Sequence, residues 1–81
     1  MIWTKIDKNE EALHLTDSTH ISVGRYDVYG IIHKSWQVID SDIAGLFNYS
    51  KRFKSKKTCK AYVERKIKRF YQELRTTMEG K

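Results

Sequence analysis

The chain has 81 residues, with 40% apolar and 32% charged side chains, one cysteine and a formal net charge of +6 at pH 7. This length fits one small domain around a single core, and one cysteine excludes an internal disulfide. The sequence has no run of about 18 apolar residues that could span a bilayer, and its N-terminal residues lack the apolar middle of a signal peptide. We therefore expect a cytoplasmic protein without membrane association.

Charge is distributed unevenly along the sequence. Residues 1–50 contain four basic and seven acidic side chains, whereas residues 51–81 contain twelve basic and three acidic ones. The two parts therefore carry net charges of −3 and +9. An asymmetry of this size predicts a polyanionic or acidic partner for the C-terminal part.

Two alternating segments predict the start of an antiparallel sheet. Residues 2–6 alternate apolar and polar side chains, as in a strand with one buried face. Residues 13–23 have the same alternation on both sides of a polar turn and predict a β-hairpin. A loop centred on Asp17 pairs Leu13 with Ile21 and keeps one face apolar, which register selection favours.

The same register makes His14 and His20 direct neighbours on the opposite face of the hairpin. After this hairpin the apolar positions change from odd to even numbers, and Gly24 lies at the change. A β-bulge at Gly24 would absorb the extra residue and bend the sheet. Residues 34–39 predict the next strand, paired with residues 25–29.

Residues 46–54 predict a further strand with one aromatic and one basic face. The alternation places aromatic side chains and Lys51 on one face, namely Phe47, Tyr49 and Phe53. Arg52 and Lys54 fall on the other face with Asn48 and Ser50.

A long helix is predicted after Ser55, which suits the N-cap position. Its apolar residues recur at helical spacing and form one stripe: Cys59, Val63, Ile67, Phe70 and Leu74. Cys59 lies on this stripe, so we expect a buried, unreactive thiol. The predicted fold is α+β, one domain over residues 1–81. A bent antiparallel sheet of four to five short strands (1–54) packs on one long C-terminal basic helix (55–79).

This helix is longer than the sheet. A helix over residues 56–78 spans roughly 34 Å, whereas a strand of five or six residues covers about 17–20 Å. The last turns should therefore extend beyond the sheet and expose Tyr71, Leu74 and Met78. A partner protein, a second copy in a homodimer, or fraying of the helix end are the alternatives for this segment.

A cluster of cations precedes and begins the helix, and it predicts a nucleic-acid-binding site. Its members are Lys51, Arg52, Lys54, Lys56, Lys57 and Lys60, with Lys68 and Arg69 extending the track. Cations in a first helical turn oppose the helix dipole, yet they suit a phosphate site together with the free N–H groups. Tyr49 and Phe53 would stack on bases beside this track. About five neutralised phosphates give a salt slope near −4 to −5 on duplex DNA.

Phosphate contacts carry little sequence information, so DNA and RNA both remain candidate ligands. The main alternative is a protein-interaction module or inhibitor that docks its basic face on an acidic protein. A third interpretation is that the lysines only maintain solubility while Tyr49 and Phe53 lie in the core.

Catalysis and metal binding have little support in the sequence. His14 and His20 supply two imidazoles, but no further ligands stand at metal-binding spacings. No glycine-rich phosphate loop, HExxH or GxSxG pattern is present. We therefore expect a protein that is not an enzyme and that needs no cofactor or metal.

The order of short strands followed by a basic helix, over roughly residues 20–75, resembles small sheet-plus-helix DNA-binding modules such as the arm-binding domains of tyrosine recombinases. This resemblance concerns architecture, without a diagnostic motif, and implies DNA binding. Compact, cysteine-poor chains of this size also resemble mobile-element and phage proteins that block host machinery. That resemblance implies the protein-binding alternative, since a fold alone does not fix function.

Overall fold

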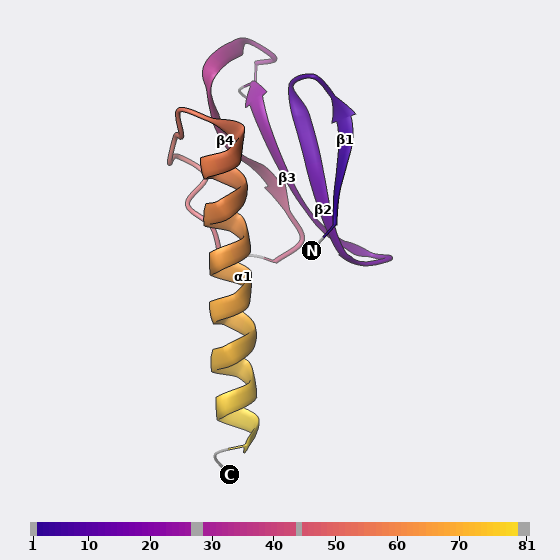
Figure 1. The fold of residues 1–81 in the computed structure, drawn as a ribbon, viewed down its shortest axis with the longest axis vertical. Coiled ribbons are helices and arrows are strands. Elements are labelled where there is room, and N and C mark those ends of the chain that lie inside the picture. The colour runs from indigo at the N-terminus through magenta and orange to yellow at the C-terminus, as the bar shows by residue number, and fades with distance from the viewer. Residues whose placement is uncertain (1, 27–28, 44, 80–81) are drawn as a thin grey trace.

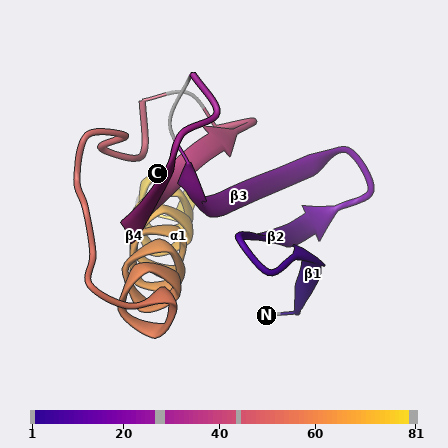
Figure 2. The ribbon, with the colours of Figure 1, turned by 90° about the horizontal axis from the view of Figure 1, so that it is seen from above.

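A computed structural model describes residues 2–26, 29–43 and 45–79. Four antiparallel strands form a sheet in the order β1-β2-β3-β4, and one helix packs on one face of it (Figures 1 and 2). The elements are β1 (Trp3–Asp7), β2 (Glu10–Thr16), β3 (Thr19–Tyr26), β4 (Ile32–Ser41) and α1 (Lys56–Glu79). The predicted α+β fold is therefore confirmed, with four strands.

The hairpin of β2 and β3 has the predicted register, with the pairs Leu13–Ile21 and His14–His20. Its loop differs from the prediction. Thr16 pairs with Thr19, so only Asp17 and Ser18 connect the strands. A register shift between His14 and Thr16 accommodates the extra residue. This register shift lets the hairpin combine a two-residue turn with the pairing that keeps one face apolar.

The predicted irregularity at Gly24 is present, since the pairing of β3 with β4 shifts on either side of it. A Cβ atom at Gly24 would lie 2.9 Å from Cδ1 of Ile39 and 3.1 Å from the carbonyl oxygen of Asn9. Glycine therefore permits a close approach of neighbouring chain segments. β4 is longer than the predicted 34–39, and Asp27 and Val28 of the predicted partner strand lie outside the described residues.

The prediction of a strand over residues 46–54 is wrong. The chain between β4 and α1 is a loop, and only Phe53 pairs with a strand, through two 2.8 Å hydrogen bonds with the backbone of Trp36. Asn48 starts a turn in which its carbonyl accepts from the Lys51 N–H and its side chain accepts from the Ser50 N–H. Such asparagine turns interrupt an extended chain.

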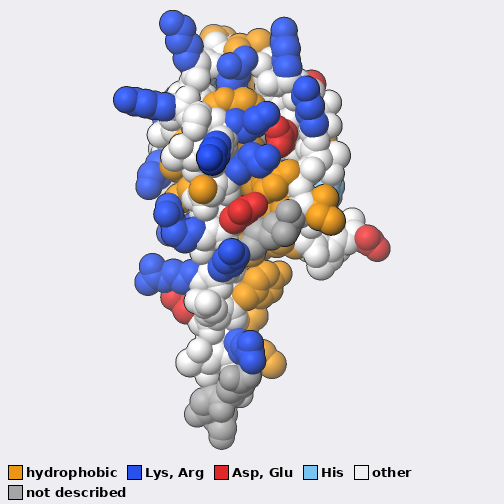
Figure 3. All heavy atoms as spheres, viewed as in Figure 1, with side chains coloured by type: hydrophobic (Ala, Val, Ile, Leu, Met, Phe, Trp, Pro, Cys, Tyr) orange, Lys and Arg blue, Asp and Glu red, His pale blue; other side chains and the backbone are white. Residues whose placement is uncertain are grey.

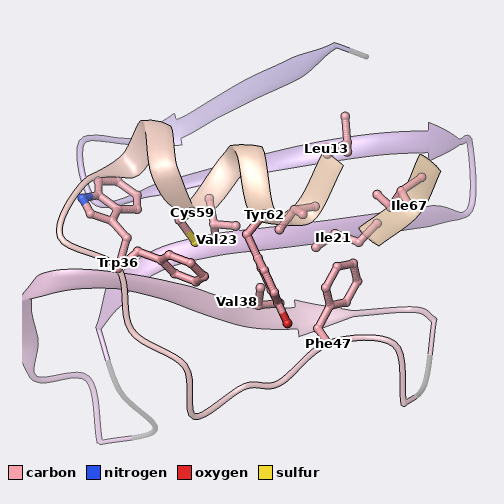
Figure 4. Close-up of a cluster of buried hydrophobic side chains, with 11 residues drawn as sticks. Leu13, Ile21, Val23, Trp36, Val38, Phe47, Cys59, Tyr62 and Ile67 are labelled. Carbon is pink, nitrogen blue, oxygen red and sulfur yellow. The ribbon is translucent and has the colours of Figure 1, made fainter. Parts of the chain in front are cut away.

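The core lies between α1 and the facing side of the sheet (Figure 4). The sheet contributes buried apolar side chains from three strands: Leu13, Ile21, Val23, Trp36 and Val38. The helix contributes Cys59, Tyr62, Val63 and Ile67, and the loop contributes Phe47 and Phe53. The alternation of Phe47 and Phe53 thus marks two anchors of an irregular loop in the core.

The helix begins as predicted. Ser55 caps it, because its hydroxyl accepts a 3.1 Å hydrogen bond from the Thr58 N–H. The last turns extend beyond the sheet, and the molecule is 47 Å long but only 24 Å and 21 Å across (Figure 1). In the described part of the chain, α1 is too polar to cross a bilayer.

Cys59 is fully buried on the helix, and burial raises the pKa of its thiol to about 12. The reactive thiolate is therefore scarce at pH 8 in the folded protein. We expect iodoacetamide to leave the native protein unlabelled at pH 8, on a timescale on which the urea-unfolded chain reacts completely. Mass spectrometry of both samples measures this, and equal labelling rates would contradict a buried Cys59.

Candidate nucleic-acid interface

Exposed cations surround the beginning of α1 and the end of the preceding loop. Figure 3 shows lysine and arginine side chains over this part of the surface, with few carboxylates among them. We call Lys51, Arg52, Lys54 and Lys57 the basic cluster; all four are exposed. The loop places the first three, and the first helical turn places Lys57.

Lys56 and Lys60 do not belong to this free surface. Their ammonium groups lie 2.6 Å and 2.8 Å from the two carboxylate oxygens of Glu11, a buried residue of β2. Lys56 and Lys60 also lie over the rings of Trp36 and Trp3, respectively. The prediction that both lysines face a ligand is corrected here, because a carboxylate from the first half of the chain already pairs with them.

Glu11 is held in its charged form by these two lysines. Burial by itself would raise the pKa of its carboxyl group. The hydrogen bonds and positive charges of Lys56 and Lys60 outweigh that effect and keep the pKa below its ordinary value of 4.5. The three residues therefore form a structural ion-pair bridge between β2 and α1.

The predicted stacking aromatics are not both available. Phe53 lies in the core, with its ring centre 5.0 Å from that of Tyr62. Lys51 lies over the rings of Phe53 and Tyr62, with its ammonium nitrogen 5.5 Å and 4.9 Å from their centres. Base stacking on Phe53 is therefore ruled out by its burial. Tyr49 is exposed, but it lines a groove with side chains of the sheet face that is turned away from α1.

The outer face of α1 continues the positive surface toward the C-terminus. Lys68 is exposed there, as is Arg65, which was not among the predicted site residues. Arg69 is also exposed, but its Nε lies 3.3 Å from Glu73 one turn later. Such an exposed pair contributes little to stability, so Arg69 can exchange its partner for a phosphate.

The importance of Glu11 was missed by sequence reasoning, although a signal exists. Glu11 has the same strand parity as Leu13, which places it on the core-facing side of β2. An acidic residue at a core position requires a cation partner. Trp3 completes the neighbourhood, since its indole N–H donates a 2.7 Å hydrogen bond to Glu64 of α1.

The predicted overhang is apolar and exposed. Tyr71, Leu74 and Met78 lie on the continuation of the core-facing stripe, beyond the sheet. They line a shallow apolar surface together with Arg75.

The two neighbouring histidines differ in their surroundings. The ring centres of His14 and His20 are 6.1 Å apart. The ring nitrogens of His20 lie 3.3 Å from Asp40 and 2.8 Å from Asp42, which sequence spacing did not reveal. Within the described ranges, no three His, Cys, Asp or Glu side chains form a group that could hold a metal ion.

Comparisons with protein-family models, with curated proteins and with solved structures find no match for this chain. The resemblance to arm-binding domains therefore stays one of element order.

Proposed function

We propose that the protein binds nucleic acid through phosphate contacts made by the basic cluster, with Arg65, Lys68 and Arg69 extending the surface along α1. One observation carries this proposal. Arg52, Lys54 and Lys57 are exposed, and no carboxylate in the described part of the chain pairs with them. Lys56 and Lys60 have such a partner in Glu11, which separates structural cations from those left for a ligand.

The position of the cluster supports the same proposal. The first turn of α1 contains no acidic side chain, although acidic residues are favoured there. Lysines at this end oppose the helix dipole at a cost of a few tenths of a kcal/mol each. An anionic ligand reverses this cost, because backbone N–H groups and ammonium groups then point toward a phosphate.

The strength of binding should depend steeply on salt. With Lys56 and Lys60 already paired, about four phosphates are neutralised, and log affinity should fall against log salt with a slope near −3.5 on duplex DNA. Fluorescence anisotropy with random duplex DNA and RNA between 50 and about 200 mM salt measures this slope. Absence of binding to either nucleic acid at the lowest salt would contradict the proposal.

A matched pair of variants locates the interface. Replacing Arg52, Lys54 and Lys57 with glutamine removes three charges from the proposed surface and should flatten the slope by about 2.7. The control replaces Lys5, Lys8 and Lys34 with glutamine, which changes the net charge equally but alters the first half of the chain. Equal losses in both variants would indicate a nonspecific effect of net charge.

A protein-interaction module is the second candidate function. The exposed apolar residues Tyr71, Leu74 and Met78 favour it. Phosphate groups do not bind apolar side chains, whereas an exposed apolar patch is typical of a protein-binding surface. An acidic partner protein would contact the basic cluster and this overhang together. Retention of a protein partner after nuclease treatment, with no binding of free DNA or RNA, would favour this candidate over the first.

A further inference from the structure

The sheet face turned away from α1 carries a groove of about 550 Å³. Ser22 alternates along β3 with the core residues Ile21 and Val23, so it faces the groove. Gln37 of β4 lines the same groove, and Tyr49 reaches it from the loop. The groove therefore lies on the opposite side of the sheet from the helix.

The lining of this groove is acidic. It contains the carboxylates of Glu10 and Asp40 and the imidazole of His20, whose Nε2 lies 3.3 Å from Asp40, and no lysine or arginine is among its described lining residues. The hydroxyl of Tyr26 donates a hydrogen bond to Glu10. Burial raises the pKa of Tyr26 to about 12, together with this hydrogen bond and the negative charges of Glu10, Asp7 and Asp40. The groove therefore carries two carboxylates and no lysine or arginine among its described lining residues, in a chain with a net charge of +6.

The floor of the groove also has an unused hydrogen-bonding group. Ser22 is only 5% exposed, and its hydroxyl has no hydrogen-bond partner in the described part of the chain. Within those same ranges, every side-chain nitrogen or oxygen that is sealed from solvent has a partner. The hydroxyl of Ser22 must therefore open into the groove, where a ligand can reach it.

We propose that this groove binds an alkylammonium or guanidinium group. A cation with several N–H donors matches the acceptors that Glu10, Asp40 and Ser22 present. The ring of Tyr49, 41% exposed, adds an aromatic surface for the cation. The group belongs either to a free polyamine or to a lysine or arginine side chain of another protein. This site is independent of the basic cluster and of the proposed nucleic-acid binding.

NMR titrations of the full chain, without nucleic acid, test the site. Spermidine represents a free polyamine, and N-acetylarginine amide represents a protein side chain. The uncharged N-acetylcitrulline amide has nearly the same shape and serves as the control. We expect saturable shifts of the amide signals of Ser22, Gln37 and Ile39 with at least one of the two cations. The compound that binds more tightly identifies the source of the group.

Two variants sharpen the test. The double change Glu10→Gln and Asp40→Asn should weaken binding of the cation about tenfold, while the amide oxygen of the introduced glutamine still accepts the hydrogen bond from the Tyr26 hydroxyl. The change Asp17→Asn removes a charge from the turn between β2 and β3, outside the residues that line the groove, and should leave binding unchanged. Shifts that do not saturate, that citrulline reproduces, or that Asp17→Asn weakens as much as the double variant would overturn the proposal.

Discussion

Replacing Lys56 and Lys60 with methionine is expected to lower the free energy of unfolding at pH 7 by about 3 kcal/mol, since a buried charge loses its partners. The side chain of Glu11 is only 9% exposed, and both lysines contact its carboxylate within hydrogen-bond distance. Methionine keeps an apolar side chain of similar length near the two tryptophan rings and removes the ammonium group, with both its charge and its hydrogen bonds to Glu11. Urea unfolding followed by tryptophan fluorescence measures the change.

The pH dependence identifies Glu11 as the cause. In the unaltered protein, Glu11 has a lowered pKa, so its stabilising effect is present above pH 4.5 and is lost as pH falls through the folded-state value. In the double variant, burial without the two lysines raises the pKa of Glu11 above its ordinary value. Glu11 is then protonated as pH falls toward 4.5, which removes the destabilising buried charge. Both effects narrow the difference between the two proteins at low pH. A difference that stays constant from pH 7 to pH 4 would contradict this explanation.

A matched control replaces Lys54 and Lys57 with methionine. Both residues are exposed and have no carboxylate partner among the described residues, so the change in stability should stay within about 0.5 kcal/mol. Lys5 stands opposite Glu11 in the register of β1 and β2 and is a potential replacement partner. Adding Lys5→Met to the double variant should therefore increase its loss of stability.

Local patterns made much of the fold predictable. The apolar stripe and the Ser55 cap predicted the bounds of α1 to within a few residues of those observed, because helical spacing and capping act over short distances. The hairpin register followed from the rule that one face stays apolar. These features depend on neighbours in the sequence, which a single chain displays directly.

The loop and the ion pairs were not predictable in this way. Phe47 and Phe53 alternate as in a strand, yet they reach the core from a loop whose direction is set by the turn at Asn48. Lys60 and Glu11 are 49 residues apart, so the sequence places the cation without showing its partner. Only the position of α1 against the sheet, which brings Lys56 and Lys60 to Glu11 of β2, decides which lysines of the predicted site remain free.

The change Ile67→Ala should lower the free energy of unfolding by about 3–4 kcal/mol, the cost of emptying a well-packed core position. Ile67 is fully buried between α1 and the sheet. For a domain of this size, each kcal/mol shifts Tm by about 4–8 °C, so the variant should unfold at a much lower temperature than the unaltered protein. Calorimetry measures the shift.

Leu74→Ala is the matched comparison, because Leu74 lies on the same stripe two turns later but is 46% exposed. If the overhang is uncovered in solution, its truncation should cost less than about 1 kcal/mol at any protein concentration. A cost that equals that of Ile67→Ala, or that grows with protein concentration, would show that a second copy covers Tyr71, Leu74 and Met78. The pair of variants therefore separates the stripe that folds the domain from the stripe that is left for a partner.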